Sequence, residues 1–102
     1  MLDSQGFVDM RNFLKRRISY ARYRVGNTWT KVPLNGIDVQ SNGVVRARLH
    51  INSGGNQITV NRVELYNTDA VLFCHQDCSI TVAAGQTGIL FWFDFNITEE
   101  AE

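Results

Sequence analysis

The residues most suited to chemistry lie together in one stretch, Cys74-His75-Gln76-Asp77-Cys78. Two thiolates, an imidazole and a carboxylate are all groups that zinc accepts as ligands. The C-x3-C spacing has no second ligand pair, however, and successive strand residues point to opposite faces, so Cys74 and His75 would diverge. We therefore expect no metal and no cofactor, but a tight turn between two small buried thiols. A cross-hairpin disulfide is a less favoured alternative.

Motifs for catalysis are missing from the sequence. It contains no nucleophile elbow, no glycine-rich phosphate loop and no HExxH motif. Its acidic residues are scattered singly, and His50 lies among arginines, so no acid–base pair is indicated. We expect a protein that is not an enzyme and has no catalytic residues. A small enzyme of β-barrel type, with a site built from distant loops, is a third alternative.

A basic stripe is the first candidate for ligand binding. Arg46, Arg48 and His50 alternate with apolar residues and would share one face of a strand. Further basic and aromatic residues that could extend this surface are Tyr20, Arg22, Tyr23 and Arg24. Domains that bind nucleic acid are usually basic overall, and the net charge here is zero. The charge therefore favours a solvated face, or a face that meets acidic partners, over nucleic-acid binding.

An aromatic platform is the second candidate. Trp29 and Tyr66 could stack on a sugar ring. The competing expectation is that Trp29 packs beneath an N-terminal helix, because tryptophan is buried on average.

Charge is distributed unevenly along the chain. Residues 1–31 hold seven Lys or Arg and two Asp, a net charge of +5, so residues 32–102 carry −5. Opposite ends of this kind can pair within one chain or between copies. The first residues lack the basic start and apolar run of a secretory signal, and no apolar stretch is long enough to span a bilayer. We expect synthesis in the cytoplasm without a signal peptide, and no membrane partner.

The N-terminal segment predicts the one helix of the chain. Its apolar residues recur at spacings of three and four, which places them on one face: Phe7, Met10, Phe13 and Leu14. A helix of about three turns is marginal alone, so this face must pack on the protein's own β domain or on another chain. We divide the chain into a helical arm, residues 1–17, and a β domain, residues 18–102.

From residue 18 onward the hydrophobic period changes to two. About eight short antiparallel strands follow at intervals of roughly ten residues, a pattern typical of an all-β sandwich. The expected strands cover residues 18–25, 28–32, 37–40, 44–51, 57–66, 70–74, 78–83 and 88–97. A change of phase in the fifth predicts a β-bulge near Asn61. The last carries an inward row of five large apolar residues and is expected to form the centre of the core.

Two stretches resemble small structural modules of bacteriophage tails, baseplates and fibres. Residues 21–34, Ala-Arg-Tyr-Arg-Val-Gly-Asn-Thr-Trp-Thr-Lys-Val-Pro-Leu, are similar to the opening strands of such modules. Residues 80–87, Ile-Thr-Val-Ala-Ala-Gly-Gln-Thr, are similar to their strand–Ala-Gly–strand corners. A helical arm before a compact sandwich without catalytic motifs is also similar. The resemblance implies a jelly-roll-like sandwich, self-association that is often threefold, and a role in virion assembly or host attachment.

These observations lead to a non-enzymatic structural or assembly protein of phage or prophage origin. It would act as a homo-oligomer, with a trimer favoured, and would contact other virion proteins. The apolar face of the arm would dock on a neighbouring copy, and the basic front and acidic end would set the orientation. The alternative is a carbohydrate-binding β-sandwich module that binds a glycan. Its candidate ligand-binding residues are Trp29, Tyr66, Arg46 and Arg48.

Overall fold

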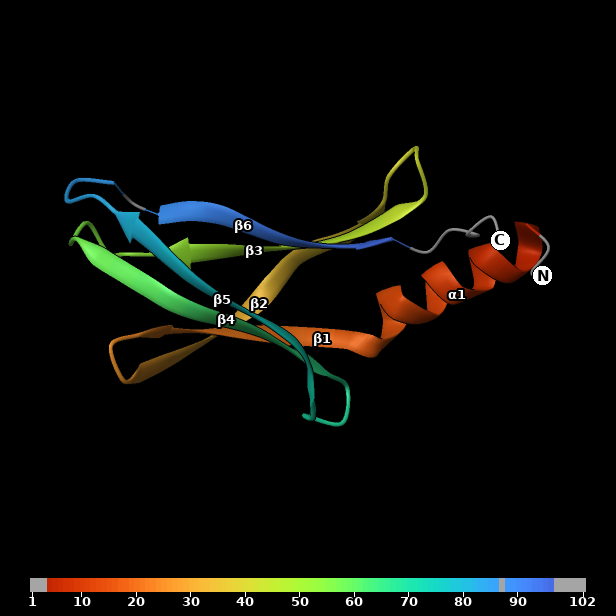
Figure 1. Cartoon of the computed structure of the whole chain (residues 1–102), viewed down its shortest axis with the longest axis horizontal. Helices are drawn as coiled ribbons and strands as arrows, with labels where there is room; N and C mark the ends of the chain where they lie inside the picture. Colours follow the sequence, from red (N-terminus) through yellow and green to blue (C-terminus); the bar gives the residue numbers. More distant parts are fainter. Residues whose placement is uncertain (1–3, 87, 97–102) are drawn as a thin grey trace.

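The computed structural model describes residues 4–86 and 88–96. In this part of the chain one helix, α1 (Ser4–Arg17), precedes six strands of a single antiparallel sheet. The strands are β1 (Ile18–Val25), β2 (Thr28–Val39), β3 (Val44–Asn52), β4 (Ile58–Asn67), β5 (Leu72–Val82) and β6 (Gly88–Asn96). Their order in the sheet is β5-β4-β1-β2-β3-β6. The sheet curls into a nearly barrel-like shape, so that β3 and β6 face β4 and β5 across the interior (Figure 1).

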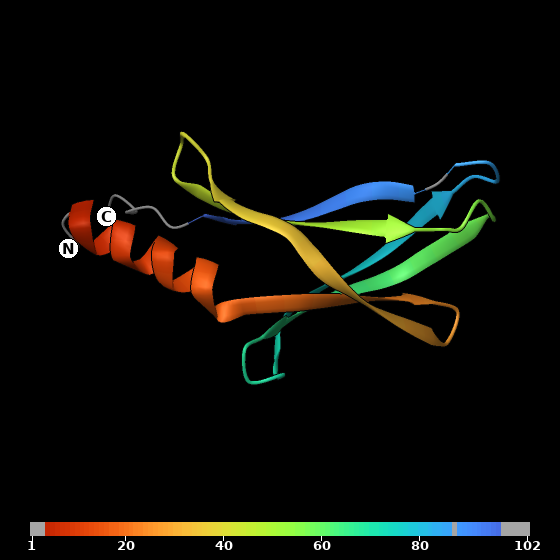
Figure 2. The same cartoon turned by 180° about the vertical axis from the view of Figure 1, so that it is seen from behind.

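The long strand β2 makes this curling possible. Its first part pairs with β1 up to Pro33, and its second part pairs with β3 from Leu34 onward. A register shift between Leu34 and Gly36 lies at the start of the second part, and a bulge of this kind bends the strand that contains it. Seen from behind, β2 crosses from one layer of the molecule to the other (Figure 2). One strand therefore belongs to both halves of the sheet.

The expectation of an all-β antiparallel protein with a short N-terminal helix is confirmed. The expected two-sheet sandwich of about eight strands is not, because the described residues form six strands in one sheet. The strands expected at residues 28–32 and 37–40 are joined in β2, which ends at Val39, since Asn35-Gly36 forms a bend within a strand rather than a turn between strands. The pairing of β2 with both β1 and β3 outweighs the preference of Asn35-Gly36 for a turn.

β5 also joins two strands that the sequence predicts separately, at residues 70–74 and 78–83. The intervening His75, Gln76 and Asp77 do not form a turn but continue the strand, opposite residues of β4. The hairpin expected at these residues is therefore wrong. The paired backbone of β4 supplies hydrogen bonds that a turn would have to replace.

The predicted bulge near Asn61 is confirmed. Arg24 lies opposite Arg62, but the next residue, Val25, lies opposite Val60, so that Asn61 is passed over in the register. The pairing of β4 with β5 shifts at the same place. This extra residue explains the change of hydrophobic phase along β4.

The core lies between the two halves of the curled sheet. The buried residues of its main cluster are Ile18, Ala21, Tyr23, Ala47, Leu49, Ile51, Val60, Val63, Leu65 and Phe93. Most of them come from β1, β3 and β4. The expectation that the last strand forms the centre of the core is wrong, because β6 is an edge strand. Only Phe93 is buried there, while Phe91 and Phe95 are half-buried, and Ile97 lies outside the described residues.

Candidate functional site

The first candidate site is α1, which projects from one end of the sheet along the long axis of the molecule (Figures 1 and 2). Its base is anchored, because Arg17 binds the side chains of Thr68 and Asp69 in the β4–β5 connection. Beyond that base, none of its residues is buried. The Cα radius of gyration is 15.5 Å, whereas a compact domain of this length has about 13 Å. The protein's own sheet therefore gives this helix little support.

The side of α1 that meets the rest of the chain contains Phe7, Arg11 and Leu14, which are half-buried. The Arg11 guanidinium lies 5.7 Å from the centre of the Phe7 ring and also against Gly43, in the turn between β2 and β3. Two of the four residues predicted for the apolar face of the arm, Phe7 and Leu14, thus lie on the inward side of the helix.

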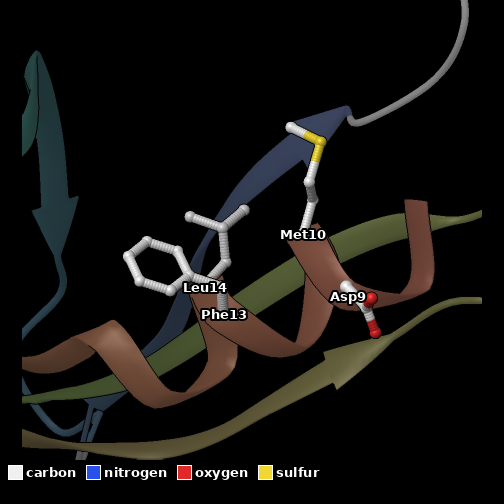
Figure 3. A pocket seen from close by; sticks show the side chains of 4 residues that line it. All are labelled: Asp9, Met10, Phe13 and Leu14. Carbon is white, nitrogen blue, oxygen red and sulfur yellow. The ribbon is translucent and has the colours of Figure 1, made fainter. Parts of the chain in front are cut away.

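The other two arm residues, Met10 and Phe13, lie beside this inward line and are exposed to 44% and 55%. They line an apolar hollow of about 430 Å³ together with Leu14 and Asp9. Figure 3 shows Met10 and Leu14 rising from the same side of the helix, with the ring of Phe13 beside Leu14. The helix thus offers an apolar surface with a recess, and Asp9 is the charged residue beside it.

The second candidate site is the outer face of β4, β1 and β2, which we name the arginine–aromatic face. Its members are Tyr20, Arg22, Arg24, Trp29, Lys31, Arg62, Glu64 and Tyr66. Arg22 is the central residue. Its guanidinium lies 4.0 Å from the centre of the Trp29 ring and 5.1 Å from that of Tyr66. The Tyr66 ring stacks in parallel on Tyr20, with 5.0 Å between ring centres.

The carboxylate of Glu64 joins the strands under this face. It accepts hydrogen bonds from Arg22 Nε at 2.6 Å, from Arg62 Nε at 2.9 Å and from the Tyr66 hydroxyl at 2.7 Å. Although Glu64 points outward, these groups cover it and leave it only 4% exposed. Burial acts to raise the pKa of Glu64, but the three hydrogen bonds and the charge of Arg22 outweigh it and lower the pKa. The carboxylate is therefore enclosed, and its ionised form is the one that these contacts stabilise.

Trp29 and Tyr66, the candidate sugar platform, do share the arginine–aromatic face. Arg22 lies over both rings, so a sugar would compete with its guanidinium for the Trp29 surface. The expectation that Trp29 packs beneath the helix is wrong. Trp29 pairs with Arg24 near the β1–β2 turn, at the opposite end of β1 from α1 (Figure 1).

The basic stripe of β3 meets acidic partners within the same chain. Arg46 donates two hydrogen bonds to Asp94 on β6, at 2.8 and 3.1 Å, and Arg48 forms an ion pair with Asp38 on β2 at 2.6 Å. The hydrogen bond from Arg46 lowers the pKa of Asp94. Two of the charges that would attract a phosphate backbone are thus already paired.

The two cysteines are free and lie four residues apart on the continuous strand β5. That spacing separates their Cα atoms by about 13 Å, whereas a disulfide needs less than about 7 Å. Burial raises the pKa of Cys74 to about 11, which makes it a poor nucleophile. In the parts of the chain that the structure describes, no three His, Cys, Asp or Glu residues are grouped so that they could hold a metal ion.

Comparison with known proteins gives no match, whether with family models, with curated proteins or with solved structures. Within residues 4–86 and 88–96, no helix is long and apolar enough to cross a membrane.

The lowered pKa values predict a loss of stability in acid. A carboxyl group whose pKa is depressed by folding contributes its full stabilisation above the unfolded pKa, and this is lost as the pH falls through the folded pKa. For Glu64 the loss should therefore begin below its ordinary value of 4.5, and Asp94 adds to it below 3.8. Thermal unfolding between pH 7 and pH 3 measures the effect. Glu64→Gln should flatten this dependence, and an unchanged slope would contradict the assignment.

Proposed function

We propose that this protein is a non-enzymatic structural or assembly protein that acts by self-association through α1. The observation that carries the proposal is the projecting helix with no buried residue and with Met10 and Phe13 exposed. An isolated helix of 14 residues is of marginal stability in water, so a partner surface would stabilise it. Burial of one large apolar side chain contributes about 1.5–3 kcal/mol.

The occupant that we propose is α1 of a second copy. Phe13 both lines the apolar hollow and protrudes beside it, so one surface offers both the protruding ring and the recess that would receive it. Such a surface is complementary to itself, as an interface about a two-fold axis requires. The charge distribution also supports contact between copies, because residues 1–31 carry +5 and the remainder −5.

The biological setting of the proposal comes from the sequence resemblance alone. The resemblance of residues 21–34 and 80–87 to phage tail, baseplate and fibre modules supports a phage or prophage origin and a place in the virion. The trimer that it also implies would need a further surface, because a self-complementary contact at α1 joins copies in pairs. Other virion proteins would then be further partners.

The test is the molar mass in solution, measured by light scattering at physiological salt. We expect wild type to have a multiple of the chain mass of 11.6 kDa, and Phe13→Ser to reduce that mass by half or more. Val8→Ser is the matched control, because Val8 is 42% exposed on the same helix but does not line the hollow. Circular dichroism checks that both variants fold. A monomeric wild type, or an unchanged mass for Phe13→Ser, would overturn the proposal.

Binding of carbohydrate is the alternative function, and its support is that Trp29 and Tyr66 share a face. Arg22 already stacks on both rings, so the geometry supports this function less than self-association.

A further inference from the structure

The sheet has two edge strands, and they differ in how they could meet another strand. β5 pairs with β4 through a register interrupted by two shifts, and it carries His75 and Asp77. β6 pairs with β3 through nine consecutive positions without a shift. Bulges and charges on an edge discourage pairing with other chains. β5 therefore has features that protect its edge, and β6 is a regular strand that is open to pairing.

The composition of β6 strengthens this contrast. Natural edge strands are commonly protected by lysine, by proline or by an inward-pointing charge. β6 contains none of these, and its one charged residue, Asp94, points outward and is paired with Arg46. A regular, apolar and unprotected edge is a template for an added strand.

Apolar side chains remain uncovered on both sides of this edge. On the outer side, Leu90 and Trp92 are 45% and 46% exposed. On the inner side, Ile89, Phe91 and Phe95 are only half-buried, although they pack against the core. Among the described residues no strand pairs with the free edge of β6, although the ring of Phe73 on β5 meets that of Phe95 edge-on across the gap, with 5.8 Å between ring centres. An added strand would cover both sets of side chains.

We propose that β6 pairs with β6 of a second copy, antiparallel and about a two-fold axis at Trp92. This pairing joins the two six-stranded sheets into one continuous sheet. The interface is distinct from α1, so it adds a second self-contact to the one proposed for the helix. Two different self-contacts on one chain allow assemblies larger than either contact alone would build.

The position of the axis follows from the strand itself. Trp92 is the middle residue of Gly88–Asn96, so an axis there uses the full length of the strand and forms the largest number of backbone hydrogen bonds. It places Phe91 opposite Phe93 of the second copy, so that inner residues meet inner residues. The two Trp92 side chains meet at the axis, and no two like charges lie opposite each other.

A disulfide gives a positive test of this axis. Directly opposed residues of antiparallel strands have Cα atoms about 4.5–5.5 Å apart, within the range that a disulfide requires. Full-length Trp92→Cys should therefore form a cross-linked dimer on mild oxidation, seen at twice 11.6 kDa on non-reducing gels. Thr81→Cys, exposed on the other edge strand, and wild type with its native Cys74 and Cys78 should not. Failure of Trp92→Cys to cross-link would overturn the proposed axis.

A charge gives the complementary test in solution. Trp92→Glu would place two carboxylates opposite each other at the axis, whereas within one chain the new carboxylate lies opposite Arg48 and is tolerated. In a Phe13→Ser background, which removes the α1 contact, we expect a dimer that becomes a monomer when Trp92→Glu is added. Thr81→Glu should leave that dimer intact.

The two contacts can be told apart by these variants. A reduced mass for Trp92→Glu with an unchanged mass for Phe13→Ser would support β6 pairing and overturn the α1 contact. A Phe13→Ser protein that is already monomeric would overturn β6 pairing, and circular dichroism verifies that each variant remains folded.

Discussion

Replacing Glu64 with alanine is expected to lower the free energy of unfolding by about 2–4 kcal/mol. Removal of one partner from a buried ion pair costs about 3–5 kcal/mol, because the other charge is left uncompensated. Here the side chains of Arg22 and Arg62 are 36% and 23% exposed, so both regain part of their hydration and the expected loss is smaller. The hydroxyl of Tyr66 loses its acceptor as well.

Chemical denaturation measures this loss, and Asp69→Ala supplies the matched control. Asp69 also pairs with an arginine, at 2.7 Å from Arg17, but it is 70% exposed. An exposed pair contributes less than about 1 kcal/mol. Equal losses for the two variants would contradict the role of burial at Glu64. Glu64→Gln, which keeps the shape but removes the charge, should lie between them.

The contacts of Glu64 also explain the arginine–aromatic face. Arg22 and Arg62 both donate to this carboxylate, and Arg62 reaches on to Asp77 on β5. The contacts thus cross from β1 through β4 to β5. Because the arginines are engaged within the chain, the arginine–aromatic face is explained as a polar clamp that fixes the register of three strands.

The sequence could not reveal this clamp, because it depends on a pairing between distant segments. β1 pairs with β4, and Arg22 lies opposite Glu64 only in that register. Alternation along a strand can indicate which residues face outward, but it carries no information on which strands are neighbours. The outward Glu64 between apolar Val63 and Leu65 was the available signal.

The sequence predicts the elements correctly where the local preference of a segment agrees with its pairing in the sheet. α1, β1, β3 and the bulge of β4 follow from hydrophobic periodicity. The break expected between strands 28–32 and 37–40 and the turn expected at residues 75–77 are wrong, because both segments are paired to neighbouring strands. Turn propensities describe an isolated segment, and long-range pairing can override them.

The apolar row of β6 also shows that a local sequence pattern does not reveal which strands are neighbours. Five alternating apolar residues predict burial, and this led to the expectation of a central strand. The sheet order places β6 at an edge, where Phe93 is buried but Ile89, Phe91 and Phe95 are only half-buried. A pattern that predicts more burial than one chain provides is itself a reason to expect a partner, and it agrees with the pairing proposed for β6.

The attachment of β6 to β3 leads to the second large expected effect, at Gly88. A Cβ atom at this position would collide with the backbone oxygen of Ile51 and would lie 2.9 and 3.0 Å from ring atoms of His50. A backbone oxygen held in a sheet cannot yield as the end of a flexible side chain can. Gly88→Ala should therefore separate the start of β6 from β3, at a cost typical of overpacking, about 1–3 kcal/mol.

Gly54→Ala is the control for the collision at Gly88. Gly54 also has a positive φ, of 64°, but a Cβ atom there would meet nothing within 4 Å. Gly54→Ala carries the strain of a side chain in the left-handed region, whereas Gly88 has a φ of 159°, close to extended backbone. A larger loss for Gly88→Ala than for Gly54→Ala in chemical denaturation is therefore the result expected from the collision with Ile51. Equal losses of unfolding free energy for the two variants would mean that β6 moves away from Ile51 without destabilising the sheet. Because the two-fold pairing needs a straight β6 from Gly88 to Asn96, we also expect Gly88→Ala to weaken the cross-link of Trp92→Cys, while Gly54→Ala leaves it unchanged.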